Sequence, residues 1–262
     1  MSQASFNRRV WALALPIIAT NVTVPFLGLV DTAVVGRLPG AEYMGAVAIG
    51  AVIMNVIYSS LNFLRMGTTG LTAQSYGAGD ADQMRSWLAR ACLLSTVLGL
   101  GLVALQLPIL GVSHWLMGAS DAVWPLTESY FQIRIWGAPA ALLNFALLGW
   151  FFGVQNMRAA LIAQVFLNGL NIVLDVWFVL GLGWGVDGVA WATIISEYSA
   201  GALGLWLAVR QLAKLGGRWR WERIRDTSRI RRMLGVNRDI FIRSMCLQAA
   251  FVVFTSAGTR MG

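Results

Sequence analysis

The chain has 262 residues, of which 57% are hydrophobic and only 12% charged, and its formal net charge is +8. This composition excludes an ordinary soluble domain, in which about 25% of the residues are charged. A basic chain can also bind nucleic acid, but the positive charge is gathered in one segment and we expect no nucleic-acid partner. The sequence therefore predicts a membrane protein.

Seven stretches are apolar and long enough to cross a bilayer, which takes about 20 residues of helix. They cover residues 10–36, 42–72, 83–112, 122–152, 158–183, 187–213 and 236–260. They do not show the alternating ten-residue segments that are typical of membrane β-barrels. We therefore predict an all-α polytopic membrane protein.

The first stretch resembles a secretory signal because Arg8 and Arg9 precede it. It is longer than the apolar part of a signal, it contains Pro25 and Asp31, and no small-residue cleavage site follows it. We expect a mature helix. Proline bends a helix, so Pro25 is either a hinge that responds to protonation of Asp31 or a static kink.

The basic residues indicate the orientation in the membrane. Ten of the 20 Lys and Arg residues lie between Arg210 and Arg238. Loops rich in Lys and Arg stay on the cytoplasmic side, which places this segment and the amino terminus inside. Two inside ends require an even number of spans between them, in agreement with six. We predict a bacterial-type inner (plasma) membrane location with a cytoplasmic amino terminus.

Three regions follow from this pattern. Residues 1–213 form a six-helix transmembrane lobe, and residues 214–235 form a basic cytoplasmic linker. The linker is either an amphipathic helix on anionic lipid or a solvated connector. Residues 236–262 form a seventh helix. Many transporters consist of two equivalent halves, so we interpret this helix as the start of an incomplete second lobe.

Polar side chains in four different stretches fall at a similar depth. With a rise of about 1.5 Å per residue, Asp31, Tyr130, Asp175 and Thr193 each lie about 8 to 12 Å from the outer end of their helix. Asn171 lies one turn before Asp175, so the two side chains face the same way. The sequence thus predicts a layer of polar groups within the bundle.

A carboxylate in hydrocarbon costs at least a few kcal/mol, so such residues face the bundle interior or a water-filled cavity. Two neighbouring carboxylates repel, which favours the protonated form of one of them and suits a proton carrier. The same oxygens could hold Na⁺. The predicted coupling site for H⁺ or Na⁺ consists of Asp31, Tyr130, Asn171, Asp175 and Thr193, and Na⁺ would contact all of these except Tyr130.

Each of these residues also has a purely structural interpretation. Asp31 could be a solvated interfacial aspartate, and Asp175 a carboxylate satisfied by structural hydrogen bonds. Tyr130 could belong to an aromatic belt. Asn168, one heptad before Asp175, could serve only to join two helices.

A second polar pair lies deeper. Arg134 is about 18 Å and Glu197 about 15 Å from the start of its helix, which places both near the middle of the membrane. An unpaired arginine is costly there, so we predict an intramembrane ion pair. The alternative is that Arg134 faces water alone.

No combination of residues predicts an enzyme. The sequence shows no metal-ligand cluster, no nucleophile with a neighbouring base and no phosphate-binding loop. Cys92 and Cys246 both lie within apolar stretches, and His114 is the only histidine. We expect no cofactor other than the coupling ion.

Four segments resemble the amino-terminal half of a known transporter family. They are LALPIIATNVTVPFLGLVDTAVVGRL, FLRMGTTGLTAQSYGAGD, IRIWGAPAALLNFALLGWFFGVQNMR and NGLNIVLDVWFVLGLGWGVDGVAWATIISEY. The chain is similar to the multidrug and toxic compound extrusion (MATE) family, in its DNA-damage-inducible (DinF-like) branch. The resemblance extends over essentially the whole chain and covers the amino-terminal lobe plus the seventh helix.

The resemblance implies a twelve-helix antiporter with two lobes in a V shape, which exports organic compounds in exchange for H⁺ or Na⁺. It implies a small-molecule substrate, contact with membrane lipid, and a second lobe that transport requires. Bending of the first helix at Pro25 is implied to accompany protonation of the nearby carboxylate. The family's coupling positions match Asp31, Tyr130, Asn171, Asp175 and Thr193.

Two other functions remain open. A lipid-linked oligosaccharide flippase of the same superfamily shares the two-lobe plan, although the paired carboxylates favour cation coupling. A seven-helix receptor or sensor agrees with the helix number, but its amino terminus normally lies outside. We therefore expect a secondary active antiporter that exports organic, cationic or amphipathic compounds.

Overall fold

The computed structural model describes residues 30, 33–38 and 40–261, of which residue 249 and residues 251–261 are described by their backbone alone. In this part of the chain the regular structure is helical, which confirms the predicted fold class. The helices are α2 (Ala41–Leu61), α3 (Phe63–Gly77), α4 (Ala81–Ala104), α5 (Gln106–Met117), α6 (Trp124–Arg134), α7 (Ala138–Gly153), α8 (Met157–Asp175), α9 (Gly185–Leu215), α10 (Trp221–Arg225) and α11 (Thr227–Met261).

Five helical segments of the described chain are long and apolar enough to cross a membrane. They are Ala41–Gly77, Ala81–Ala104, Trp124–Gly153, Met157–Gly181 and Gly185–Leu215. Each overlaps a stretch predicted from hydropathy. The first predicted stretch lies almost wholly outside the described residues, and α11, which contains the seventh, is not among the five.

Several spans are interrupted, which hydropathy alone did not predict. Asn62 separates α2 from α3, and Leu105 separates α4 from α5. Pro108 has no N–H to donate to the carbonyl of the preceding turn, which explains the break after α4. Pro139 acts in the same way between α6 and α7, where Ile135–Gly137 forms the 3-10 helix η1.

The segment Met157–Gly181 changes its hydrogen-bond register immediately after Asp175. The six residues Val176–Gly181 form a π-helix, η2, that continues α8. Short π-helical segments are rare and frequently lie at functional sites. Glycines with positive φ, Gly183 (70°) and Gly185 (57°), then turn the chain into α9.

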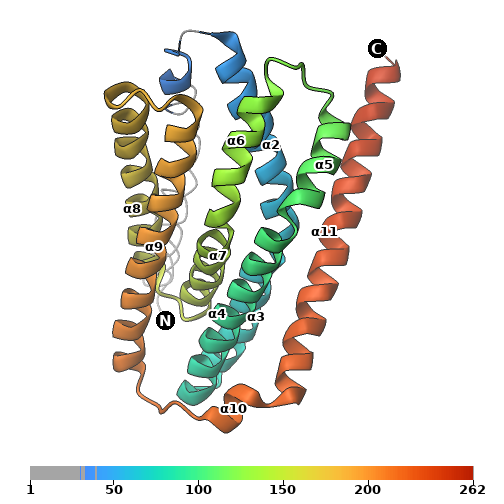
Figure 1. Ribbon diagram of the computed structural model, residues 1–262. Coiled ribbons are helices and arrows are strands. Elements are labelled where there is room, and N and C mark those ends of the chain that lie inside the picture. Colours follow the sequence, from blue (N-terminus) through green and yellow to red (C-terminus); the bar gives the residue numbers. More distant parts are fainter. Residues whose placement is uncertain (1–29, 31–32, 39, 262) are drawn as a thin grey trace, which may run out of the picture.

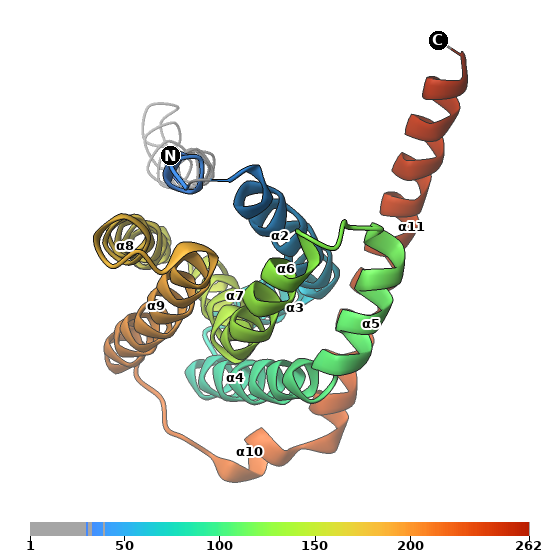
Figure 2. The ribbon, with the colours of Figure 1, turned by 45° about the horizontal axis from the view of Figure 1, so that its top comes forward.

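Helix α7 lies at the centre of the lobe, between α3, α4 and α9 (Figures 1 and 2). Trp150 and Phe151 have no exposed surface. Gly149 and Gly153, four residues apart, face α3 so closely that a methyl group at Gly149 would overlap the backbone of Arg65. Small residues of this kind let membrane helices pack closely.

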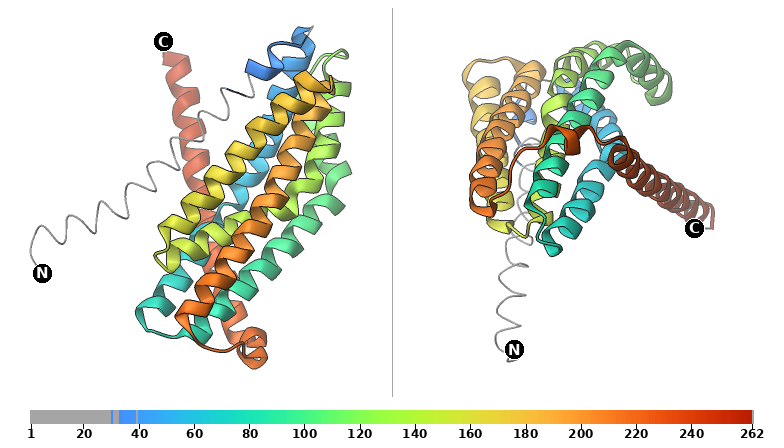
Figure 3. Two further views of the ribbon diagram at one scale, coloured as in Figure 1. Left: turned by 90° about the vertical axis from the view of Figure 1, so that its left-hand side faces the viewer. Right: turned by 90° about the horizontal axis from the view of Figure 1, so that it is seen from below.

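Helix α11 stands at the edge of the bundle and diverges from it toward its carboxyl end (Figure 3). Its first turns pack on α3 and α4, where Met233 contacts Leu71 and Trp87. It begins at Thr227, whereas residue 236 was the predicted start, so the linker is shorter than expected. The side chain of Asp226 accepts the backbone N–H of Ser228 (2.9 Å), which caps the first turn.

Candidate functional site

Asp175 is the last residue of α8 and has no exposed surface. Asn171, one turn earlier, is 1% exposed. Leu174 and Phe178 pack with Ala192 of α9 beside them. An acid and an amide thus lie together on the buried face of a membrane helix, directly before its change to π-helical register.

Thr193 joins this buried face from α9. The amide nitrogen of Asn171 lies 3.3 Å from the Thr193 hydroxyl oxygen and donates a hydrogen bond to it. The Thr193 hydroxyl in turn donates to the carbonyl oxygen of Val189, at 2.9 Å. The structure therefore places two predicted site residues from different helices in direct contact.

Tyr130 of α6 is 5% exposed. It packs with Val179 and Val189, which lie one turn from Asp175 and Thr193 on their own helices. Tyr130 therefore belongs to the buried core of the lobe and not to a belt at its surface. Its ring passes over Gly50 of α2, where a methyl group would overlap it.

Asp31 and Pro25 lie outside the described residues. Val34 and Val35, three and four residues after Asp31 in the sequence, belong to the cluster that contains Tyr130. Asn168 is 4% exposed and accepts a hydrogen bond from the side-chain amide of Gln164, at 3.0 Å.

Arg134 and Glu197 form a two-point ion pair between α6 and α9. The two guanidinium nitrogens lie 2.8 and 3.1 Å from the two carboxylate oxygens. Arg134 is 7% and Glu197 6% exposed, so the pair is shielded from solvent. This geometry provides parallel charge-assisted hydrogen bonds, which are among the strongest in proteins.

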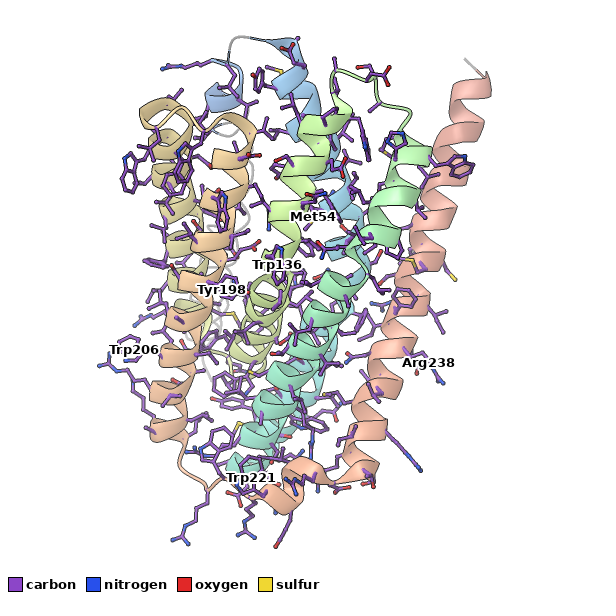
Figure 4. All side chains as sticks on the ribbon, viewed as in Figure 1. Met54, Trp136, Tyr198, Trp206, Trp221 and Arg238 are labelled. Carbon is purple, nitrogen blue, oxygen red and sulfur yellow. The ribbon has the colours of Figure 1, made fainter. Side chains whose placement is uncertain are left out.

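Sequence reasoning missed the residues around this pair. The side-chain amide of Asn144 donates to the backbone oxygen of Glu197 (2.9 Å), and the ring of Tyr58 lies 5.7 Å from the Arg134 guanidinium carbon. A methyl group at Gly137 would lie 2.5 Å from a Glu197 oxygen. The hydroxyl of Tyr198, the residue after Glu197, donates a hydrogen bond to the backbone carbonyl of Trp136 at 3.0 Å; Figure 4 labels both residues. Asn144 is the one amide in the apolar sequence of α7, and it could have indicated a buried polar contact there.

The described part of the site offers oxygen atoms to a ligand. Within the described ranges no group of three or more His, Cys, Asp or Glu residues is placed to hold a metal ion. The oxygens available on α8 and α9 are the carboxylate of Asp175, the amide of Asn171 and the hydroxyl of Thr193. Such ligands suit H⁺ or Na⁺.

The MatE family model matches residues 16–177. The chain belongs to the MatE family. This match confirms the resemblance found in the sequence. The family consists of multi-pass membrane transporters and not of enzymes.

Among curated proteins, the chain is 45% identical to DNA damage-inducible protein F of Escherichia coli (strain K12), over 98% of the chain and 56% of that protein. It is 30% identical to Protein DETOXIFICATION 44, chloroplastic, of Arabidopsis thaliana, over 75% of the chain and 40% of that protein. A probable multidrug resistance protein NorM of Shewanella oneidensis is 28% identical over 69% of the chain and 39% of that protein. The chain thus spans about half the length of these relatives.

Solved structures agree with this family. A crystal structure of MATE in complex with MaD3S matches with a TM-score of 0.78 and 25% identity, over 95% of this chain and 56% of that chain. An outward-facing conformation of a multidrug resistance MATE family transporter of the MOP superfamily matches with a TM-score of 0.76 and 25% identity, over 93% and 54%. The MatE fold therefore extends over nearly the whole chain.

Proposed function

We propose that the chain is the amino-terminal half of a secondary antiporter that exports organic, cationic or amphipathic compounds in exchange for H⁺ or Na⁺. The observation that carries this proposal is the complete burial of Asp175 beside Asn171 within a membrane span. Ionisable side chains within membrane spans are rare and costly, and they commonly mark ion pathways or proton relays. The names of several relatives, which refer to multidrug resistance, support the class of substrate.

In this proposal Asp175 carries the coupling cation. Asn171 and Thr193 hold each other by their hydrogen bond, so their remaining oxygen lone pairs can be offered at fixed positions. Tyr130 closes the site from α6, and Asp31 supplies a second carboxylate from the first helix. Binding of a cation cancels the charge of a buried carboxylate, which changes how well α8 packs on its neighbours.

The π-helix directly after Asp175 is the segment whose structure would respond to cation binding. In a π-helical segment each backbone hydrogen bond spans one residue more than in an α-helix, so a change between the two shifts the hydrogen bonds by one residue. Loading of Asp175 would alter the balance between the two registers in Val176–Gly181. A hinge at Pro25, if the first span bends there on protonation of Asp31, would provide the second moving element.

Transport in this proposal requires a second lobe, because alternating access moves one lobe against the other. We place the lobe in the inner membrane of a bacterial-type cell with the amino terminus in the cytoplasm, on the distribution of basic residues. The arginine-rich segment that follows α9 would then be cytoplasmic.

The proposal is tested by efflux of a fluorescent organic cation. Cells would produce the chain joined to the carboxyl-terminal half of its E. coli relative, and parallel cells would produce the chain alone. We expect the joined protein to export the compound when a pH or Na⁺ gradient is imposed, and the chain alone to export none. Equal efflux with and without both gradients would contradict antiport.

A further inference from the structure

The segment that links α9 to α11, residues 216–226, is fixed to the lobe and does not hang free. We call this segment the strap. It runs around the outside of the start of α4 and contains the short helix α10 (Figures 2 and 3). It lies where the spans Ala81–Ala104 and Gly185–Leu215 begin and end.

Two aspartates at the start of α4 hold the strap from one side. A carboxylate oxygen of Asp82 lies 2.7 Å from the guanidinium of Arg220, and its other oxygen accepts the backbone N–H of Arg218, also at 2.7 Å. Both oxygens of Asp80 lie 2.9 Å from a guanidinium nitrogen of Arg223. Two of the strap's arginines are therefore neutralised by the lobe itself.

Two arginines of α4 also bind the strap, through its backbone. Arg85 donates to the backbone oxygen of Gly216 at 2.9 and 2.7 Å, and Arg90 donates to the backbone oxygen of Ile224 at 3.0 Å. Because these bonds use backbone atoms, they fix the path of the strap without engaging its side chains. The strap thus presents a defined outer face.

That outer face combines aromatic and basic side chains. Trp219 is 50% and Trp221 71% exposed, although tryptophan buries a large apolar area when it can. Guanidinium groups lie beside both rings, with Arg85 at 5.5 Å from Trp219 and Arg225 at 5.9 Å from Trp221. Arg218 and Arg225 are exposed, and in the described part of the chain no carboxylate pairs with either.

We propose that this outer face binds the headgroups of anionic phospholipids at the membrane surface. Trp219 and Trp221 would lie at the boundary between headgroups and acyl chains, where exposed tryptophans are stable. Arg218 and Arg225 would bind the phosphates, for which the planar guanidinium is suited. Figure 4 shows Trp221 at the end of the bundle.

Lipid is the occupant that this arrangement favours. The face carries positive charge beside apolar rings, and it adjoins the ends of two helices that are long and apolar enough to cross a membrane. The strap contains one exposed acid, Glu222, against the two unpaired arginines, so its outer face attracts anions. The proposal concerns binding of lipid and does not depend on the transport proposed above.

Tryptophan quenching tests the proposal on the purified full chain in detergent. Phosphatidylglycerol with brominated acyl chains is titrated in, and the midpoint of quenching is compared with that of brominated phosphatidylcholine. The difference between wild type and Trp219→Phe/Trp221→Phe isolates the signal of the two strap rings. We expect strap quenching at a lower concentration of the anionic lipid.

Arg218→Gln/Arg225→Gln should raise the midpoint for the anionic lipid by about fivefold for each arginine removed. The control Arg37→Gln/Arg158→Gln removes the same charge from exposed residues elsewhere and should leave the midpoint unchanged. Equal midpoints for the two lipids, or an equal shift in the control, would overturn the proposal. Loss of strap quenching on addition of inorganic phosphate alone would overturn it also.

Discussion

Arg134 and Glu197 form a two-point ion pair one helical turn from Tyr130 and Thr193, respectively. The same two helices, α6 and α9, therefore carry the proposed coupling layer and the ion pair in adjacent layers. Removing one partner would leave a buried charge without its counter-ion, which costs far more than the pair contributes. The pair thus fixes how α6 faces α9.

Arg134→Gln and Glu197→Gln should each destabilise the protein by about 3 to 5 kcal/mol, because each leaves one uncompensated charge in the bundle. The double exchange Arg134→Glu/Glu197→Arg should recover a large part of the loss. Thermal unfolding of detergent-solubilised protein, followed by size-exclusion chromatography, measures this. Failure of the exchange to improve on either single variant would contradict the structural role of the pair.

Gly137→Ala should separate the pair without removing a charge. The added methyl group would lie 2.5 Å from a Glu197 oxygen and 2.9 Å from an Arg134 nitrogen. Overpacking of this kind costs about 1 to 3 kcal/mol. Gly101→Ala is the matched control, since a methyl group there meets no atom within 4 Å and a helical alanine is favoured. Equal melting temperatures for the two variants would argue against the close packing.

Thr193→Val should leave the amide of Asn171 without its hydrogen-bond acceptor while keeping the shape of the side chain. A buried donor left unsatisfied costs about 1 to 3 kcal/mol. Thr193→Ser retains the hydroxyl and should keep most of the stability. If the two variants have the same melting temperature, the hydrogen bond between Asn171 and Thr193 does not contribute to stability.

Hydropathy predicted most of this fold. The predicted stretch 187–213 corresponds to α9, Gly185–Leu215. Depth arguments also paired Arg134 with Glu197, because a single charge at mid-membrane needs a partner at its own level. Both arguments depend only on how apolar or charged a residue is and on its depth in the bilayer, and both quantities can be read from the sequence.

Other features could not be predicted in this way. The π-helix after Asp175 is a shift of backbone hydrogen bonds within an apolar run, and no side chain signals it. The strap depends on contacts such as that between Arg90 and Ile224, which are 134 residues apart. The close approach of Gly137 to Glu197 can be recognised only when the positions of both residues in space are known. Neither hydropathy nor helical periodicity contains that information.

The first turn of α11 should loosen in acid. The Ser228 hydroxyl (2.6 Å) and two backbone N–H groups donate to Asp226, which lowers the pKa of that carboxyl. A group with a lowered pKa in the folded state stabilises it above the unfolded value, about 3.9, and this contribution is lost as the pH falls through the folded value. The protection of the amides of residues 227–230 from hydrogen exchange, relative to their intrinsic exchange rate at each pH, should therefore fall at low pH.

The matched control for this prediction is Asp226→Asn. Asparagine still caps a helix but does not titrate, so the protection of these amides, relative to the intrinsic rate, should no longer fall as the pH is lowered through the pKa of Asp226. Equal pH profiles for both proteins would show that another group is responsible.

The role of Asp175 is tested most directly by substrate-driven cation movement. Proteoliposomes would contain the chain joined to a second lobe, either as wild type, as Asp175→Asn, or as the control Asp121→Asn, which alters an exposed carboxylate. We predict that substrate exchange against H⁺ or Na⁺ is retained in wild type and Asp121→Asn and abolished in Asp175→Asn, with all three proteins equally folded. Coupled exchange at the wild-type rate in Asp175→Asn would contradict the assignment of Asp175 as the carrier of the coupling cation.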